Sequence, residues 1–442
     1  MSTDSDHHAH PALAISGLSV RYPRAANPVL REVDLSVGPG EAVGLTGRSG
    51  AGKTSLLHAV AGLVPWLTPA SVGGEVAVHE EAIQDLDPGQ RAHLIATCLD
   101  RPDAQLFLAT VGQEIEAARR LYRGGDFVAA VVDGFGLGPY LDRRVTELSS
   151  GERQRVALAV ALAGCPRPIL LDEPTAHLDA AGEAALVDLL RQAKSRGAAI
   201  TVSEQAGWRL DSVVTSWAEV FGGRLGPTEA PRVPKVPAPN HQAGSEVVLS
   251  GRGLSVSRGG RTLVENIDLD LHQGEVVFLS GPHGSGKSTL ARVLAGLAAT
   301  GGGEIRRNGR VALMLPEADL QLFASTVIGE VSDARTSQEE RARVLRRHRL
   351  EHLAARAPWT LSRGEQQRLV HAALDMLRPE VMIVDEPAQG LDPGDVLDLF
   401  ELIRRRSAKG RAYLIISHRE ELAAAAHRRL EIRHGCIEEV TP

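Results

Sequence analysis

The sequence is poor in aromatic residues, in cysteine and in long apolar runs. Phenylalanine, tryptophan and tyrosine make up 3% of the 442 residues, and the formal net charge is −6. A nucleic-acid-binding surface needs a basic face and rings on which bases stack, so we expect no nucleic-acid partner. The three cysteines lack metal-type spacing, which argues against a disulfide framework and against a zinc or iron–sulfur domain.

The apolar segments are those of a soluble chain. The longest, such as residues 156–163, are too short to span a bilayer, and no signal peptide precedes residue 20. We therefore expect a cytosolic chain in a reducing compartment. Apolar residues make up 43% of the sequence, enough for two cores of about 200 residues each. The basic residues within 341–349 fall in one predicted helix. They would form either a solvated face or a contact surface for a partner.

Two glycine-rich loops of the form G-x-x-x-x-G-K-[ST] occupy residues 47–54 and 281–288. The glycines let successive N–H groups point at the phosphates of a nucleotide, the lysine reaches the β- and γ-oxygens, and the final hydroxyl ligates Mg²⁺. Residues 42–46 and 276–280 predict the strand before each loop, and residues 55–60 and 289–295 predict the helix after it. The sequence therefore predicts two nucleotide sites, with contacts from Gly47, Ser49, Gly50, Gly52, Lys53, Thr54, Ser55, Gly281, Gly284, Gly286, Lys287, Ser288 and Thr289.

The two halves of the chain repeat each other. Residues 34–47 match residues 268–281 at an offset of 234 (268 − 34), and everything from Leu148 onward matches at 213 (361 − 148). The second copy is thus 21 residues shorter (234 − 213), mostly between its phosphate loop and Gln321-Leu322-Phe323. Duplication with one internal deletion is the simplest account.

A proline-rich segment separates the repeats. Prolines 227, 231, 234, 237 and 239 mark residues 222–245 as an extended linker. The expected organisation is a tail over 1–11, a first domain over 12–221, the linker, and a second domain over 246–442. His7, His8 and His10 of the tail could bind a transition metal, although a disordered tail is the more usual interpretation.

Strand-type and helix-type runs alternate within each half. Residues 168–171, 199–202, 381–384 and 413–416 predict strands, and residues 182–193 and 396–406 predict helices. This alternation predicts an α/β fold with a mostly parallel sheet and helices on its faces. Ligands should gather at the carboxyl ends of the strands.

Each half carries an Asp-Glu pair at the end of an apolar strand, Asp172-Glu173 and Asp385-Glu386. The aspartate can hold Mg²⁺ through water, and the glutamate can act as general base on an attacking water. A solvated carboxylate pair is the plainer interpretation, but both pairs occur at the same place in their repeat. Upstream, residues 148–152 and 361–365 (Leu-Ser-x-Gly-Glu) open a helix whose free N–H groups suit a terminal phosphate.

With these motifs in order, nearly the whole chain resembles a tandem ATP-binding-cassette protein. The resemblance implies two P-loop NTPase domains, each with a helical subdomain, that bind and hydrolyse ATP with Mg²⁺. In that family two cassettes face each other head to tail, and each ATP lies between the phosphate loop of one and the signature of the other. By position, one site would combine Lys53, Thr54, Asp172 and Glu173 with Ser362 and Gly364, and the other Lys287, Ser288, Asp385 and Glu386 with Ser149 and Gly151.

A narrower resemblance lies in residues 101–107 (Arg-Pro-Asp-Ala-Gln-Leu-Phe), echoed by Gln321-Leu322-Phe323. It is similar to the Gln-Asn-Pro-x-x-Gln-Leu-Phe segment of energy-coupling-factor and cobalt-type importer ATPases, which faces the membrane-embedded partner. Glu114 and Glu330 follow at the same spacing in each half. The alternative left open is a cassette of another importer or exporter.

The two halves depart from the family pattern unequally. The glutamine that the family places near Mg²⁺ aligns with Asp100 in the first half and with Pro316 in the second. Asp100 could still approach the ion, whereas the side chain of Pro316 cannot coordinate it. The histidine that contacts the γ-phosphate is His418, and its counterpart Gln205 can hydrogen-bond a phosphate but cannot shuttle a proton as imidazole does. Arg363 replaces a small residue in the signature that would serve the Gln205 site.

The adenine-stacking position differs as well. Tyr22 occupies it in the first half, and its counterpart Arg258 either stacks through its guanidinium plane or is exposed. We hypothesise from these differences that the first site mainly binds ATP and that the second hydrolyses it.

The resemblance implies an ATPase subunit at the cytoplasmic face of the membrane that energises transport by separate integral-membrane subunits, with import of a vitamin or transition metal expected. A twin-cassette factor acting on ribosomes is the alternative, although a longer, charged, helical linker would be expected there. A twin-cassette DNA-repair ATPase would need zinc-type cysteine pairs, which the sequence lacks. In such systems the selectivity for the cargo resides in the membrane partners.

Overall fold

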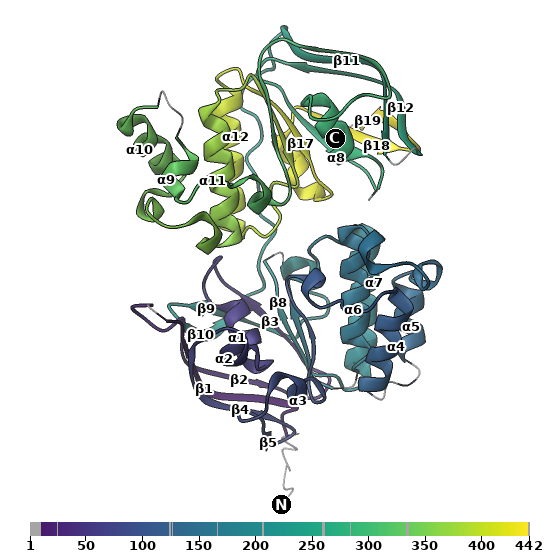
Figure 1. Cartoon of the computed structure of the whole chain (residues 1–442), viewed down its shortest axis with the longest axis vertical. Helices are drawn as coiled ribbons and strands as arrows, with labels where there is room; N and C mark the ends of the chain where they lie inside the picture. Colours follow the sequence, from purple (N-terminus) through teal and green to yellow (C-terminus); the bar gives the residue numbers. More distant parts are fainter. Residues whose placement is uncertain are drawn as a thin grey trace, which may run out of the picture. The chain divides into compact units, whose positions relative to one another are not determined.

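A computed structural model describes residues 10–23, 25–122, 125, 127–165, 167–205, 207–258, 261–282, 284–332 and 336–440. The chain divides into two compact units, Met1–Arg232 and Val233–Pro442. Each unit combines a central, mostly parallel sheet with a second, antiparallel sheet and flanking helices (Figure 1). None of the helices in the described ranges is long and apolar enough to cross a membrane.

The first unit is built on a six-stranded sheet in the order β10-β9-β3-β8-β7-β6. Only the β9–β10 pair is antiparallel. The strands are β3 (Ala42–Thr46), β6 (Ala96–Cys98), β7 (Ile169–Asp172), β8 (Ile200–Ser203), β9 (Ser216–Phe221) and β10 (Arg224–Thr228). Its antiparallel sheet, ordered β2-β1-β4-β5, contains β1 (Leu13–Arg21), β2 (Leu30–Val37), β4 (Ser71–Val78) and β5 (Glu81–Ala82).

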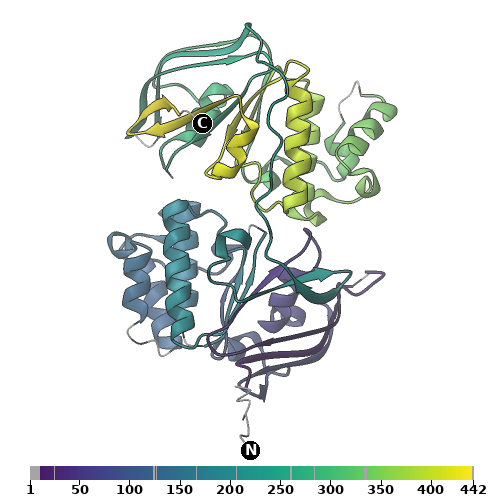
Figure 2. The same cartoon turned by 180° about the vertical axis from the view of Figure 1, so that it is seen from behind.

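Seven α-helices accompany these sheets in the described part of the first unit. They are α1 (Lys53–Val60), α2 (Leu63–Trp66), α3 (Pro88–Ala92), α4 (Val111–Leu121), α5 (Phe127–Gly134), α6 (Ser150–Leu162) and α7 (Ala180–Ser195). Helices α4 and α5 pack on α6, and α5 also packs on α7, which forms the helical subdomain seen from both sides in Figure 1 and Figure 2.

The second unit repeats this plan. Its six-stranded sheet runs β15 (Val311–Met314), β16 (Val381–Asp385), β17 (Ala412–Ile416), β13 (Val276–Ser280), β18 (Arg428–Arg433) and β19 (Cys436–Glu439). The antiparallel sheet contains β12 (Arg261–His272), β11 (Val247–Arg258) and β14 (Gly302–Arg307). The helices are α8 (Lys287–Leu294), α9 (Val327–Glu330), α10 (Gln338–Arg347), α11 (Arg363–Met376) and α12 (Pro393–Ser407).

The central strands form because they are continuous apolar runs that helices cover on both faces. Every residue of β7, β13, β16 and β17 is buried. Each buried Leu, Ile or Val side chain contributes about 1.5–3 kcal/mol relative to exposure. The predicted α/β architecture is therefore confirmed, whereas the antiparallel sheets were not anticipated from the strand-helix alternation.

The linker differs from the expected range. Residues 224–228, placed in the linker by their proline content, form β10 and pair with β9 through a turn at Gly222 and Gly223, whose φ values are 58° and 82°. Pro227 is tolerated because β10 is an edge strand, where one N–H needs no partner in the sheet. The tail falls outside the described residues except for its end, where His10 forms an ion pair with Glu80.

The predicted basic helix is also shorter than expected. Helix α10 ends at Arg347, and Arg349 has a φ of 57°, so residues 341–349 do not lie in one helix. The deletion in the second copy corresponds to α2, β5 and α3 of the first unit. In the second unit, residues 295–317 form no helix. Positive φ at both Gly136 and Arg349 extends the 213-residue offset (349 − 136) to this turn, upstream of Leu148.

Candidate active site

Each phosphate loop joins a buried strand to a helix. Strand β3 leads into the first loop and α1 leaves it, and β13 and α8 do the same in the second unit. Both helices begin without a side-chain cap, so their first N–H groups are available to an anion. The loop glycines have positive φ, at Gly47 (135°), Gly50 (78°), Gly52 (115°), Gly281 (142°), Gly284 (76°) and Gly286 (98°).

The loop lysines fold back over their own loops. Lys53 Nζ donates to the carbonyl oxygen of Gly47 at 2.8 Å, and Lys287 Nζ donates to that of Gly281 at 2.6 Å. Both lysines are buried. This geometry holds each ammonium group beside the turn of N–H groups, where it can pair with the β- and γ-oxygens of a bound nucleotide.

Each of the two predicted aspartates lies at the carboxyl end of a central strand of its own unit. Asp172 ends β7 and Asp385 ends β16. Burial raises the pKa of each carboxyl to about 7. The charge of Glu173 acts on Asp172 in the same direction, whereas the hydroxyls of Thr54 and Ser288 act in the opposite direction on Asp172 and Asp385.

The residues present fit a magnesium ion. Neither oxygen of Asp172 has a hydrogen-bond partner among the described residues, although the hydroxyls of Thr54 and Ser203 both lower its pKa. A buried carboxylate without partners is stabilised by a cation. Thr54 and Ser288 would ligate the ion directly, with Asp172 and Asp385 behind them. When bound, the ion would neutralise charge that develops on the phosphates.

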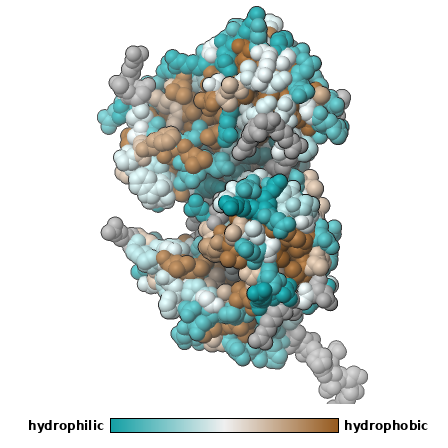
Figure 3. Space-filling view, turned by 45° about the vertical axis from the view of Figure 1, so that its right-hand side comes forward, coloured by the Kyte–Doolittle hydropathy of each residue, from teal (hydrophilic) through white to brown (hydrophobic). Residues whose placement is uncertain are grey.

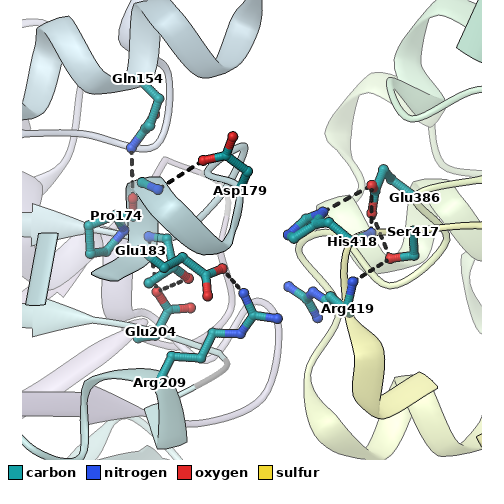
Figure 4. Close-up of polar contacts among 12 residues, drawn as sticks. Gln154, Pro174, Asp179, Glu183, Glu204, Arg209, Glu386, Ser417, His418 and Arg419 are labelled. Atoms are coloured by element: carbon teal, nitrogen blue, oxygen red, sulfur yellow. Dashed lines mark hydrogen bonds and ion pairs between the residues drawn. The ribbon is translucent and has the colours of Figure 1, made fainter. Parts of the chain in front are cut away.

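In the second unit, the catalytic candidate Glu386 is held by three hydrogen bonds. It has a φ of 50°, and its carboxylate accepts from His418 Nδ1 (2.9 Å), from the His418 N–H (3.2 Å) and from the Ser417 hydroxyl (2.8 Å) (Figure 4). Burial alone would raise the pKa of Glu386, but His418, Ser417 and Arg419 together lower it to about 2. The carboxylate is therefore ionised and oriented, with the imidazole donating from Nδ1.

The matching positions of the first unit carry different chemistry. Glu173 has a φ of 47°, close to that of Glu386, but Glu204 stands where the second unit has Ser417. Glu204 is buried and accepts a hydrogen bond from the Thr175 hydroxyl at 2.7 Å (Figure 4). The Oε1 of Gln205, at the His418 position, is buried and has no hydrogen-bond partner in the described part of the chain. The first site thus gains a carboxylate and loses an imidazole.

The signature serines cap helices. Ser149 accepts a hydrogen bond from the N–H of Glu152 (3.3 Å), and the Glu152 carboxylate accepts one from the Ser149 N–H (2.7 Å). Ser362 and Glu365 form the same capping box at the start of α11. These boxes fix the helix ends, whose first turns contain Gly151 and Gly364.

The remaining predicted residues divide into three groups. Tyr22 lies beside the first phosphate loop, where its hydroxyl donates to Ser55 at 3.0 Å. Asp100 lies close to Asp172, and its charge raises the pKa of that carboxyl. The side chain of Arg258, His283 of the second loop and the tail histidines His7 and His8 lie outside the described residues.

Sequence reasoning missed several groups at these sites. His58 was missed although it follows Thr54 by four residues, a spacing that places both on one face of α1. Glu204 and Ser417 were missed although each precedes a residue that the repeat alignment had singled out. Glu317 was missed beside Pro316, and its charge raises the pKa of Asp385.

The Gln-Leu-Phe segments are held identically in the two units. Gln105 accepts from the Leu99 N–H (2.7 Å) and donates to the Thr97 carbonyl oxygen (3.3 Å). Gln321 does the same with Leu315 (2.7 Å) and Leu313 (3.0 Å).

These segments leave an aromatic ring exposed in each unit. Phe107 is 81% exposed and Phe323 is 86% exposed. Glu114 and Glu330 accept hydrogen bonds from the N–H groups of Leu108 and Ala324, just beyond each ring. Apolar side chains also gather in patches on the visible faces of both units in Figure 3. The segments therefore present a large apolar side chain on a fixed backbone.

The chain is similar to ATP-binding proteins of transporters along most of its length. A protein of Treponema denticola, provisionally named an ABC transporter ATP-binding protein, is 27% identical, with 96% of each chain covered. A Streptomyces avermitilis protein with the same provisional name is 30% identical, with 93% of this chain and 90% of that one covered. A Bacillus subtilis protein, provisionally named an HMP/thiamine import ATP-binding protein, is 27% identical, with 93% and 88% covered.

Solved structures share the fold at lower identity. A structure described as RNase-L Inhibitor has a TM-score of 0.68 at 21% identity, with 95% of this chain and 89% of that chain covered. A model of ribosome-bound archaeal Pelota and ABCE1 has a TM-score of 0.73 at 21% identity, with 96% and 78% covered. The family model described as ABC transporter matches residues 30–176 and 264–389, once in each unit. The chain belongs to the ABC transporter family, as an ATPase with two ATP-binding cassettes.

Proposed function

We propose that this protein is the ATPase subunit of a micronutrient importer of the energy-coupling-factor type, acting with Mg²⁺ at the cytoplasmic face of a membrane through separate integral-membrane subunits. ATP binding would close the cassettes and hydrolysis would reopen them. The transporter names of the relatives support this, including the HMP/thiamine import name of the Bacillus subtilis protein.

The observation that carries the proposal is the presentation of Phe107 and Phe323. A large apolar side chain on a fixed backbone is suited to a hydrophobic pocket on a partner, where aromatic anchors contribute most of the binding energy. Both rings are exposed, and a glutamine fixes each segment from behind. An isolated exposed ring would be ordinary, but the same arrangement in two cassettes points to a docking contact in each cassette.

The test is co-purification from membranes of the native organism. We expect the tagged protein to bring down an integral-membrane subunit, and Phe107→Ser with Phe323→Ser to reduce the yield at least tenfold. Phe221→Ser is the matched control, since Phe221 is 75% exposed but lies outside both segments. Co-sedimentation with ribosomes in place of membrane capture would favour the alternative, a soluble twin-cassette ATPase acting on ribosomes, for which the ABCE1 fold is a precedent.

The two ATP sites are proposed to be unequal. Glu386, with His418 and Ser417 bonded to it, has the arrangement of a general base held in place. In the first cassette, Gln205 stands at the position of His418 and the buried Glu204 at the position of Ser417. We propose that hydrolysis occurs mainly at the Glu386 site, completed by Ser149 and Gly151, and that the Glu173 site, completed by Ser362 and Gly364, mainly holds ATP.

A further inference from the structure

Three potential metal ligands come together in the first cassette. His58, Asp100 and Asp172 each offer a ligand atom, and these atoms lie within 4.8 Å of one another. Two ligands on opposite sides of a first-row metal ion, each at about 2.1 Å, are about 4 Å apart. The cluster therefore has almost the dimensions of an occupied site.

The fold brings the three residues together from separate elements. Asp172 ends β7, and Asp100 follows β6, the parallel neighbour of β7, so both carboxylates lie at the same edge of the sheet. His58 lies on α1, which packs against β7. The imidazole belongs to none of the sequence motifs that hold the nucleotide.

The cluster contains buried polar atoms without partners. Asp172 is 0% exposed, and neither of its oxygens has a hydrogen-bond partner among the described residues. The same holds for Nε2 of the half-buried His58. Buried polar groups are almost always satisfied, so an unpartnered carboxylate beside an unpartnered imidazole indicates a ligand at this point.

The second cassette lacks this combination. By the repeat offsets, Arg292 stands where the first has His58 (58 + 234) and Pro316 where it has Asp100 (100 + 216), and only Asp385 remains. Elsewhere in the described ranges, no further group of three such ligands is found.

We propose that His58, Asp100 and Asp172 bind one first-row transition-metal ion, such as Mn²⁺ or Zn²⁺, in the absence of nucleotide. Magnesium prefers an all-oxygen shell and usually depends on substrate phosphates, whereas one imidazole with two carboxylates suits manganese, iron or zinc. The metal would occupy the Asp172 side of the first ATP site. The proposal concerns that site alone and does not depend on the transport function.

The test uses full-length protein stripped of metal with a chelator, without nucleotide. To remove the tail as a competitor, His7, His8 and His10 are replaced by alanine. Mn²⁺ is titrated while the electron paramagnetic resonance signal of the free ion is followed, and Zn²⁺ is then added as competitor. We expect one Mn²⁺ per chain, displaced by Zn²⁺ and not by an equal concentration of Mg²⁺.

Two substitutions assign the ion to the cluster. His58→Arg introduces the residue that the second cassette carries at this position, and Asp100→Asn preserves shape, so both should fold with an unchanged melting temperature. Each should weaken Mn²⁺ binding at least tenfold, whereas Asp385→Asn, the matched change in the second cassette, should leave it unchanged. Equal binding in all variants, loss on Asp385→Asn, or no stoichiometric Mn²⁺ binding would overturn the proposal.

Discussion

At the scale of single residues, the two cassettes share their phosphate-loop lysines and differ around the glutamate that we propose as general base. Lys53 and Lys287 make the same bond to their own loop. Glu386 accepts hydrogen bonds from His418 and Ser417, whose positions in the first cassette are occupied by Gln205 and Glu204. Hydrolysis depends on the position of the attacking water, so the unequal catalytic glutamates should matter more than the equal lysines.

Replacing Glu386 with glutamine should therefore stop most ATP hydrolysis. A positioned base contributes about 10²–10⁴-fold to a rate, so we expect a loss of at least about 100-fold in kcat for Glu386→Gln and about twofold or less for Glu173→Gln. Steady-state phosphate release from the full chain is the measurement. Equal losses, or a larger loss from Glu173→Gln, would contradict the proposed asymmetry.

A second residue-scale difference lies in the core of the second cassette. His371 on α11 occupies the position of Leu158 in the first cassette, and burial lowers its pKa to about 3. The folded protein thus keeps His371 neutral, whereas the unfolded chain binds a proton below its ordinary pKa of 6.5. The free energy of unfolding therefore keeps its full value above pH 6.5. It decreases as the pH falls toward 3, by up to about 1.4 kcal/mol for each pH unit.

His371→Leu should remove this loss. Calorimetry of the full chain at pH 7.5 and 5.5 should show the second cassette of the parent melting about 2–4 °C lower at pH 5.5 on account of this group, and the variant less affected. Replacing the exposed His352 with leucine serves as the control. An identical pH dependence in the parent and His371→Leu would contradict the assignment.

At the scale of elements, short loops are fixed by side chains that reach back to the backbone. The side chain of Gln105 joins the first Gln-Leu-Phe segment to the preceding strand β6. The side chain of Gln321 joins the second segment to β15 in the same way. The helix that follows each segment starts at a threonine cap, Thr110 or Thr326. The exposed phenylalanines are therefore presented by a backbone fixed at both ends.

Gln321→Ala should loosen only the second segment. Loss of two hydrogen bonds, each worth about 1 kcal/mol, should raise amide exchange in residues 315–324 about tenfold or more, while residues 99–108 exchange as before. Gln105→Ala should give the reverse pattern, so each variant controls for the other. Hydrogen exchange read by mass spectrometry checks this, and uniform acceleration in both segments would contradict the local role.

At the scale of the whole molecule, the chain is a duplicated fold whose copies have separate cores. Each central sheet has six strands, and the order from the phosphate-loop strand to the Asp-Glu strand is the same, β3-β8-β7 in the first copy and β13-β17-β16 in the second. The deletion of α2, β5 and α3 does not affect these strands. Each copy therefore retains a complete phosphate loop on its own sheet.

Two ATP molecules per chain are expected. With Mg²⁺ present and Glu386→Gln as background to prevent turnover, equilibrium dialysis should give a stoichiometry near two. Lys53→Met and Lys287→Met should each reduce it to one, because each lysine lies over a separate loop. Unchanged stoichiometry in either variant would show that its lysine is dispensable for binding.

The sequence by itself determined the parts that depend on local pattern. The phosphate loops, the strands that end in Asp172 and Asp385, the helices opened by Ser149 and Ser362, and the 213-residue offset all follow from residue type and spacing, because the chemistry there is carried by neighbours in the chain. The antiparallel sheets were not predicted. Strand β10 was missed although Gly222 and Gly223 form a two-residue hairpin turn between β9 and β10, because the prolines that follow were interpreted as a linker.

Only the tertiary structure decided which distant side chains meet. Spacing along the chain did not predict that His58 lies close to Asp100 and Asp172, or that Ser417 donates to Glu386. Those contacts depend on how α1, β6, β7, β16 and β17 pack. It also decided that Phe107 and Phe323 are exposed, which composition alone would have placed in a core. Local pattern thus predicts two ATP sites with unequal residues, and packing determines which side chains those residues contact.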